Sequence, residues 1–220
     1  MAVRSFNETS QLENEYNQAS NKEIINSWHQ RNNTNRYYII DDKQTNKLGV
    51  YRNGQLVAEF DAIHGKNNST EGYTFKKRNS DGTYTDTWAS ADDMTVSYTK
   101  NDGTVDNLSG NLSTPAGMFY SNWSGTYNGA PGMIRQTKDM LDRGKGESIP
   151  AGIHVRNIIP GANTNGCTGL SKESLWRLQS ILGNAKNIET YVLPVNEENK
   201  FFIENNHLWF KNSKNRPEVS

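Results

Sequence analysis

Short strand-like runs separated by Asn-Gly and Asp-Gly dipeptides constrain this chain more than any other feature. Residues 48–51 and 56–63 flank Asn53-Gly54, a pair that favours a two-residue type I′ turn because both positions need a positive φ. Asp81-Gly82 and Asp102-Gly103 separate further short runs in the same way. The fold is therefore predicted to be mainly β. Other strands are expected at 37–40, 73–76, 84–88, 94–98 and 191–193, with a last hairpin that joins 201–203 to 207–210.

Helical spacing of apolar residues is found in two places. Residues 5–32 fit one weak amphipathic helix or two short ones that pack on the domain, with a partner-binding helix as the alternative. Ser171 has the position of an N-cap, and Gly183 ends the helix that follows it. We expect an N-terminal helical appendage at 1–34, a mainly β domain at 35–211 and a polar tail at 212–220. Within the domain, 66–113 is a hairpin-rich insertion because it has too few large apolar residues for its own core.

The composition permits a folded domain and argues against several partners. Lys and Arg total 24, as do Asp and Glu, so net charge gives no reason to expect nucleic acid or an anionic membrane. Five Trp, ten Tyr and seven Phe supply core surface although only 33% of residues are hydrophobic. No stretch is apolar enough for a transmembrane segment. Residues 1–30 show no secretion signal, which fits either a mature form or a route that needs no signal.

Cys167 and His154 are the candidate catalytic pair. A single cysteine excludes an internal disulfide and a multi-cysteine metal site, and a lone cysteine is often a small buried hydrophobe. A thiol becomes a good nucleophile at neutral pH when a neighbouring base or positive group favours the thiolate. Gly166 allows a sharp turn before the cysteine, so that backbone amides would point at one oxyanion. A buried cysteine beside a structural histidine is the competing interpretation.

The other histidines are assigned to structure or surface. His64 either lines the cleft or is structural, His207 is structural, and His29 is expected at the surface. They are too scattered in the sequence for a metal site to be argued, so neither a metal nor a cofactor is expected. The aromatic residues between 119 and 127 either form a substrate platform or pack in the core.

Several blocks, in order, resemble the L,D-transpeptidase (YkuD-type) catalytic domain. They are an opening hairpin at 38–65, a T-P-x-G-x-F motif at 114–119, a histidine segment at 152–154, a counterpart of the S/T-H-G-C motif at 164–167 and a closing strand at 191–195. The resemblance implies a β-sandwich or barrel, with 35–211 as the catalytic domain. The sequence departs from the family pattern at Asn165, which replaces a histidine, at Gly169, which replaces Arg or Asn, and at Val155, which replaces a small residue.

The resemblance also implies a function, namely a cysteine acyltransferase that acts on the L,D-amide bonds of peptidoglycan tetrapeptide stems. Cys167 would be the nucleophile and His154 its base. The remaining site residues that it implies are backbone amides for the oxyanion, at Asn165, Gly166 and Cys167, and substrate contacts at Thr164, Gly169 and Arg156. Arg156 or Arg135 would supply the positive charge that is missing at position 169.

Three outcomes remain open for such an enzyme: transpeptidation, exchange of D-amino acids, or L,D-carboxypeptidase hydrolysis. The enzyme would act in the periplasm, in the cell wall or after secretion, with peptidoglycan stem peptides as its partners. One alternative is a secreted antibacterial toxin with the same fold and chemistry, accompanied by an immunity or secretion partner. Another is a catalytically inactive peptidoglycan-binding module. Sortases rank lower because they lack the T-P-x-G-x-F block.

Overall fold

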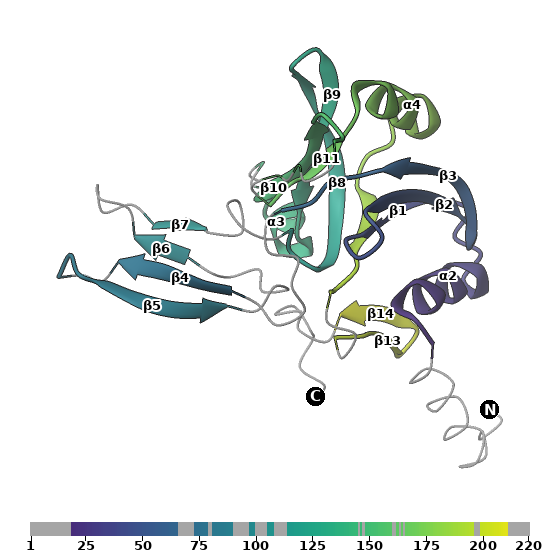
Figure 1. The fold of residues 1–220 in the computed structure, drawn as a ribbon. Coiled ribbons are helices and arrows are strands. Elements are labelled where there is room, and N and C mark those ends of the chain that lie inside the picture. The colour runs from purple at the N-terminus through teal and green to yellow at the C-terminus, as the bar shows by residue number, and fades with distance from the viewer. Residues whose placement is uncertain are drawn as a thin grey trace.

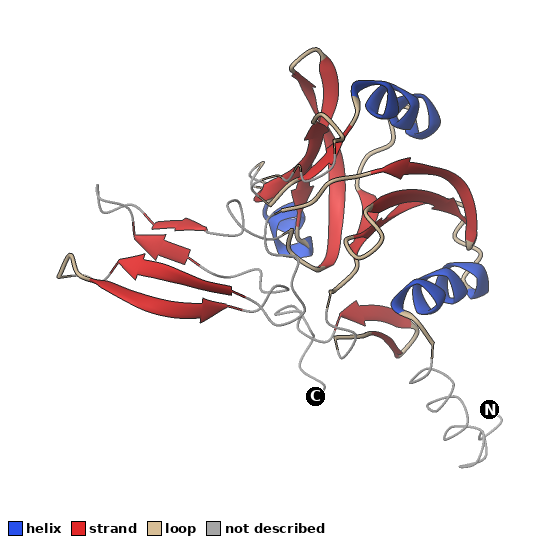
Figure 2. Ribbon diagram, viewed as in Figure 1, coloured by secondary structure: helices blue, strands red, loops and turns tan. Residues whose placement is uncertain are grey.

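The computed structural model describes residues 19–65, 73–78, 81–89, 97–99, 105–107, 114–144, 146, 148–159, 162, 164, 166–195 and 199–210. Strands dominate it, as Figure 2 shows, and the mainly β prediction is confirmed. Eight strands form one sheet: β1 (Tyr37–Asp42), β2 (Lys47–Arg52), β3 (Gln55–Asp61), β8 (Gly117–Tyr127), β9 (Ala130–Gln136), β10 (Ile149–Val155), β11 (Thr168–Leu170) and β12 (Ile188–Val192). Their order is β11-β10-β9-β8-β12-β1-β2-β3.

Two Asn-Gly hairpins supply most of this sheet. Asn53-Gly54 has positive φ at both residues, 49° and 75°, and joins β2 to β3 as the dipeptide predicts. Asn128-Gly129, with φ values of 50° and 74°, joins β8 to β9 in the same manner. This second hairpin was not predicted. The aromatic residues between 119 and 127 were expected to form a substrate platform or to pack in the core, and no strand was assigned to them. The hairpin carries the middle of the sheet.

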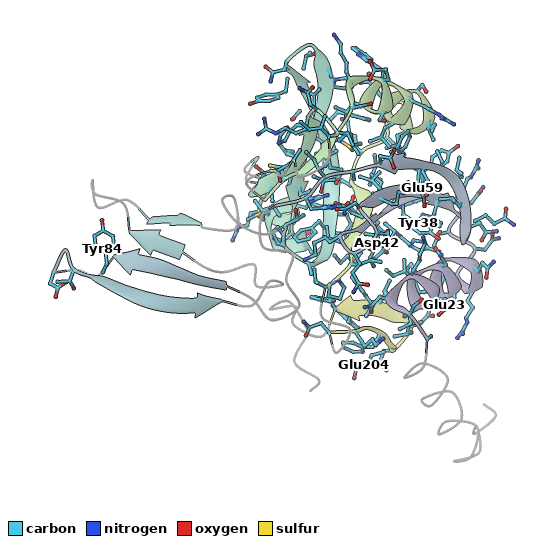
Figure 3. The ribbon with its side chains drawn as sticks, viewed as in Figure 1. Glu23, Tyr38, Asp42, Glu59, Tyr84 and Glu204 are labelled. Atoms are coloured by element: carbon cyan, nitrogen blue, oxygen red, sulfur yellow. The ribbon has the colours of Figure 1, made fainter. Side chains whose placement is uncertain are left out.

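Four further strands lie in the insertion and extend away from the main sheet (Figure 1). β4 (Tyr73–Arg78) pairs antiparallel with β5 (Tyr84–Ala89) around Asp81-Gly82, as predicted. β6 (Ser97–Thr99) pairs with β7 (Val105–Asn107), while Asp102-Gly103 lies outside the described residues. Tyr84 is exposed on this arm, at a distance from the other labelled side chains in Figure 3.

One apolar core lies under helix α4 (Lys172–Leu182). Ser171 caps this helix, since its hydroxyl accepts from the Ser174 amide at 3.1 Å, and Gly183 ends it, as predicted. Leu175 and Leu178 of the helix are fully buried in a cluster with apolar residues from the sheet. A short helix, α3 (Lys138–Arg143), follows β9 and was not predicted.

A second core involves helix α2 (Asn21–Arg31), which begins at a capping box made by Ser20 and Glu23. Ile24 and Ile25 pack in one cluster with aromatic residues of β1 and β12. The last hairpin, β13 (Phe201–Glu204) and β14 (His207–Phe210), completes this cluster with Phe201 and Phe210. Residues 1–18 of the N-terminal segment lie outside the described residues.

His29, expected at the surface, is buried in this second core, and the expectation was wrong. Its ring stacks on Tyr38 with centroids 3.6 Å apart. Nδ1 lies 2.9 Å from the Thr34 hydroxyl and Nε2 lies 3.1 Å from the Tyr191 hydroxyl, so both ring nitrogens have partners without contact with water. Burial lowers the pKa of His29 from 6.5 to about 4. The helix turns this polar residue inward, and weak amphipathicity did not reveal that face.

The two edges of the eight-stranded sheet meet at one point. The chain after β3 reaches β11, where the Ile63 amide donates to the Gly169 carbonyl at 2.9 Å and the Gly169 amide donates to the Ile63 carbonyl at 2.8 Å. A second bridge pairs Gly65 with Thr164. Because the sheet closes on itself here, Cys167, one residue before β11, is fixed from both edges.

Candidate active site

The structure brings Cys167 and His154 together on neighbouring strands. β10 runs parallel to β11 and places His154 opposite Gly169, two residues after the cysteine. The His154 side chain forms a hydrogen bond with the thiol of Cys167. Its Nδ1 lies 3.1 Å from the Val155 carbonyl oxygen. A carbonyl oxygen only accepts, so Nδ1 donates this bond, and Nε2 is the ring nitrogen that could take up a further proton.

The surroundings of Cys167 favour its thiolate. Burial alone raises the pKa of this thiol, but four opposing contributions outweigh burial and bring the pKa below its ordinary value. These are hydrogen bonds from the His154 side chain and the Gly152 backbone, and the charges of His154 and Arg135. Cys167 is thus half-buried with a lowered thiol pKa, whereas burial in apolar surroundings alone would raise the pKa.

Two threonines hold the backbone of the cysteine loop. The Cys167 carbonyl accepts from the hydroxyl of Thr164 and, at 3.3 Å, from that of Thr114. The Thr114 hydroxyl in turn accepts from the Gly65 amide at 3.0 Å, and Lys43 Nζ donates to the Thr114 carbonyl at 2.9 Å. Thr114 is the first residue of the T-P-x-G-x-F motif. In this structure it anchors the loop that carries the cysteine.

The space beside Gly169 is occupied by Arg156. A Cβ at Gly169 would lie 2.7 Å from both Cβ and Cγ of Arg156 and 2.8 Å from Cγ1 of Ile63, which is too close without a shift of these atoms. Arg156 itself is exposed and lines an open surface hollow of about 940 Å³ together with Asn128 and Lys172. The residues that line this hollow do not include the cysteine or its histidine.

A fully buried charged cluster lies beneath the cysteine loop. The Asp41 carboxylate of β1 accepts hydrogen bonds from Arg135 Nη2 at 2.5 Å and from the Thr168 hydroxyl. Its other oxygen lies 2.8 Å from His64 Nε2. Burial by itself raises the pKa of Asp41, but His64, Arg135 and the Thr168 hydroxyl reverse the shift and hold the pKa well below its usual range. Sequence reasoning missed Asp41 and Thr168. The available signal was a charged residue directly after the apolar run of β1, within the same strand.

Not every predicted site residue has a defined place. Asn165 lies outside the described residues. Thr164 and Gly166 are buried next to the cysteine, and Gly166 has φ of 101°, which glycine tolerates and other residues do not. Of the aromatic candidates, Tyr127 lies beside the histidine, with its ring centroid 5.4 Å from that of His154. Phe119 is fully buried and belongs to the core.

Of the two remaining histidines, only His64 has the buried, hydrogen-bonded position of a structural residue. His64 is buried against Asp41 and Asn46, and His207 is exposed on β14. Within the described ranges, no group of three or more His, Cys, Asp or Glu is placed to hold a metal ion. Nor is any helix there long and apolar enough to cross a membrane.

Comparisons with known proteins give similar folds and no similar sequences. No protein-family model matches the chain, and no curated protein is similar to it in sequence. An L,D-transpeptidase from Xylanimonas cellulosilytica is 13% identical with a TM-score of 0.41, over 72% of this chain and 60% of that one. Bd1075 from Bdellovibrio bacteriovorus is 14% identical with a TM-score of 0.41, over 80% and 49%. The catalytic domain of an Enterococcus faecium L,D-transpeptidase is 17% identical with a TM-score of 0.33, over 72% and 98%.

Several L,D-transpeptidase catalytic domains are thus among the solved structures that this chain resembles. The chain spans about half to three fifths of the length of the first two proteins. The identities and TM-scores are too low to carry residue roles across, so the roles of individual residues depend on the geometry of this chain.

Proposed function

We propose that this protein is a cysteine acyltransferase that acts on the L,D-amide bonds of peptidoglycan tetrapeptide stems. The observation that carries the proposal is the Cys167–His154 pair, in which a histidine on the neighbouring strand is hydrogen-bonded to the thiol and lowers its pKa. The substrate class comes from the resemblance of the sequence blocks, above all T-P-x-G-x-F followed by the histidine and the cysteine.

The proposed reaction has two steps. The Cys167 sulfur attacks the amide carbonyl carbon, and His154, which has taken the thiol proton, returns it to the leaving amine of the terminal D-residue. The C–N bond breaks and a thioester to Cys167 forms. An acceptor amine then gives a crosslink or an exchanged stem, and water gives a shortened stem, with the thiol restored in each case. Backbone amides at Asn165, Gly166 and Cys167 are the proposed donors to the oxyanion.

Incubation of purified muropeptides with the protein, followed by mass spectrometry, tests this proposal. We expect loss of the terminal D-residue, with the product mass distinguishing crosslink, exchange and hydrolysis. Cys167→Ala and His154→Ala should abolish turnover, because each removes a reacting group, while His207→Ala serves as an exposed-histidine control with full activity. Circular dichroism establishes that the inactive variants are folded. Turnover by folded Cys167→Ala would refute the mechanism.

Trapping of the intermediate provides a second test of the same proposal. A short reaction that is quenched in acid should leave a mass increase on the peptide that contains Cys167, equal to the mass of the donor stem minus that of the released D-amino acid. This adduct is expected because the thioester forms before the acceptor arrives. An adduct on another residue would assign the nucleophile elsewhere.

A further inference from the structure

Arg135 is a fully buried cation whose hydrogen bonds are incomplete. Its Nη2 donates to Asp41 at 2.5 Å and to the Thr168 hydroxyl at 2.9 Å. Its Nε and Nη1 are also buried and have no hydrogen-bond partner among the described residues. Burial of an arginine with unused donors is costly, because each lost contact with water is not replaced. Such a cost suggests a role other than stability.

The position of Arg135 connects it to the cysteine. Thr168, which it contacts, is the residue directly after Cys167. The charged and titratable groups around the thiol come from three strands, the segment after β3 and one turn: His154 on β10, Arg135 on β9, Asp41 on β1, His64 after β3, and Lys43, which reaches the loop through Thr114. Asp41 divides its contacts between Oδ1, which faces His64, and Oδ2, which binds Arg135 and Thr168. Arg135 therefore shares the Asp41 carboxylate with His64.

We propose that Arg135 is a positioning residue that holds Cys167 in its thiolate form from beneath, while Asp41 fixes the guanidinium in place and limits its effect. The role in acyl transfer rests on the proposed function, whereas the effect on the thiol does not. A buried cation acts strongly on a nearby anion because little water screens it. The charge of Arg135 is among the contributions that lower the pKa of Cys167.

The single cysteine allows a direct test without substrate. The rate of alkylation by iodoacetamide is measured against pH, and every modified residue is Cys167 because the chain has one cysteine. Arg135→Met should raise the midpoint of this profile and slow alkylation about tenfold at a pH below the midpoint, because the cation is lost. Asp41→Asn should shift the midpoint the opposite way, because a buried anion is lost. Arg52→Met, at an exposed arginine on β2, is the control and should leave the profile unchanged.

Opposite shifts distinguish a charge effect from damage to the fold. A purely structural role for the cluster would move both variants in the same direction or move neither, and either result overturns the proposal. If Arg135→Met does not fold, the double variant Arg135→Met/Asp41→Asn removes both charges, which buried pairs often tolerate. Its midpoint should then lie above that of Asp41→Asn alone, and equal midpoints would overturn the proposal.

The failure of this inference can be told apart from failure of the proposed function. If the unmodified protein turns over muropeptides and the alkylation profile of Arg135→Met is unshifted, the proposed function stands and the role of Arg135 is refuted. If the alkylation profiles shift but the unmodified protein does not turn over muropeptides, the role of Arg135 stands and the proposed substrate is refuted. Arg135→Lys should recover part of the alkylation rate, because it restores charge without the planar fork that binds Asp41 and Thr168.

Discussion

Replacement of Thr114 by valine tests how the cysteine loop is held. The Thr114 hydroxyl accepts from the Gly65 amide at 3.0 Å and donates to the Cys167 carbonyl at 3.3 Å. The valine side chain has nearly the same shape but neither donates nor accepts a hydrogen bond. The Cys167 carbonyl keeps its bond from Thr164, whereas the buried Gly65 amide has no other partner described. An unsatisfied buried donor costs about 1–3 kcal/mol.

The expected loss of unfolding free energy for Thr114→Val is therefore about 1–3 kcal/mol, or roughly 2–10 °C in Tm for a chain of this size. Urea denaturation followed by fluorescence measures it, with the midpoint lowered and the slope unchanged. Thr114→Ser keeps the hydroxyl and is the matched control, with a smaller loss from the missing methyl group. Equal stability of the valine and serine variants would refute the anchoring role of the hydroxyl.

Three further predictions concern the site and the second core. Arg156→Ala should lower kcat/KM on a carboxylate-bearing tetrapeptide about tenfold without loss of stability, and Arg156→Lys should recover part of it; unchanged kinetics would exclude Arg156 as the anion partner. A chelator should leave muropeptide turnover unchanged while a thiol-alkylating reagent blocks it, and inhibition by the chelator would contradict metal-free chemistry. The unfolded chain protonates His29 near pH 6.5, whereas the folded chain does so only near pH 4. Stability should therefore fall by about 3 kcal/mol as pH falls through this window, and His29→Gln should show less of this loss in urea melts.

The local elements were the part of the fold that the sequence could predict. The turns at Asn53-Gly54 and Asp81-Gly82, the Ser171 cap and the stop at Gly183 depend on backbone preferences of a few adjacent residues. The hairpin at Asn128-Gly129 carries the same turn signal and was missed. Its first strand, β8, bears Trp, Tyr and Phe, which suit a strand as well as a substrate platform or a core.

The pairing of distant segments could not be predicted from local patterns. The two edges of the sheet meet through Ile63 and Gly169, which are far apart in the sequence and carry no motif for this contact. The Asp41 cluster likewise depends on four segments that meet only in the folded chain. The order of a histidine and a cysteine suggested a pair, but the contact between His154 Nδ1 and the Val155 carbonyl oxygen, which orients the ring, does not show in the spacing.

The departure from the family pattern at position 169 follows from this closure. Gly169 exchanges two backbone hydrogen bonds with Ile63, and the stem of Arg156 covers the position that a side chain there would occupy. Arginine or asparagine at 169 would need both neighbours to move, so the substitution and Arg156 are sterically coupled. The positive charges that lower the thiol pKa are those of His154 and of Arg135, which is buried on β9 and bound to Asp41 and Thr168. Under the proposed function, recognition of the stem carboxylate falls to the exposed Arg156, whereas Arg135 assists His154 in favouring the thiolate. The two arginines should therefore separate by substitution: Arg156→Ala should change kinetics and leave the alkylation profile of Cys167 unmoved.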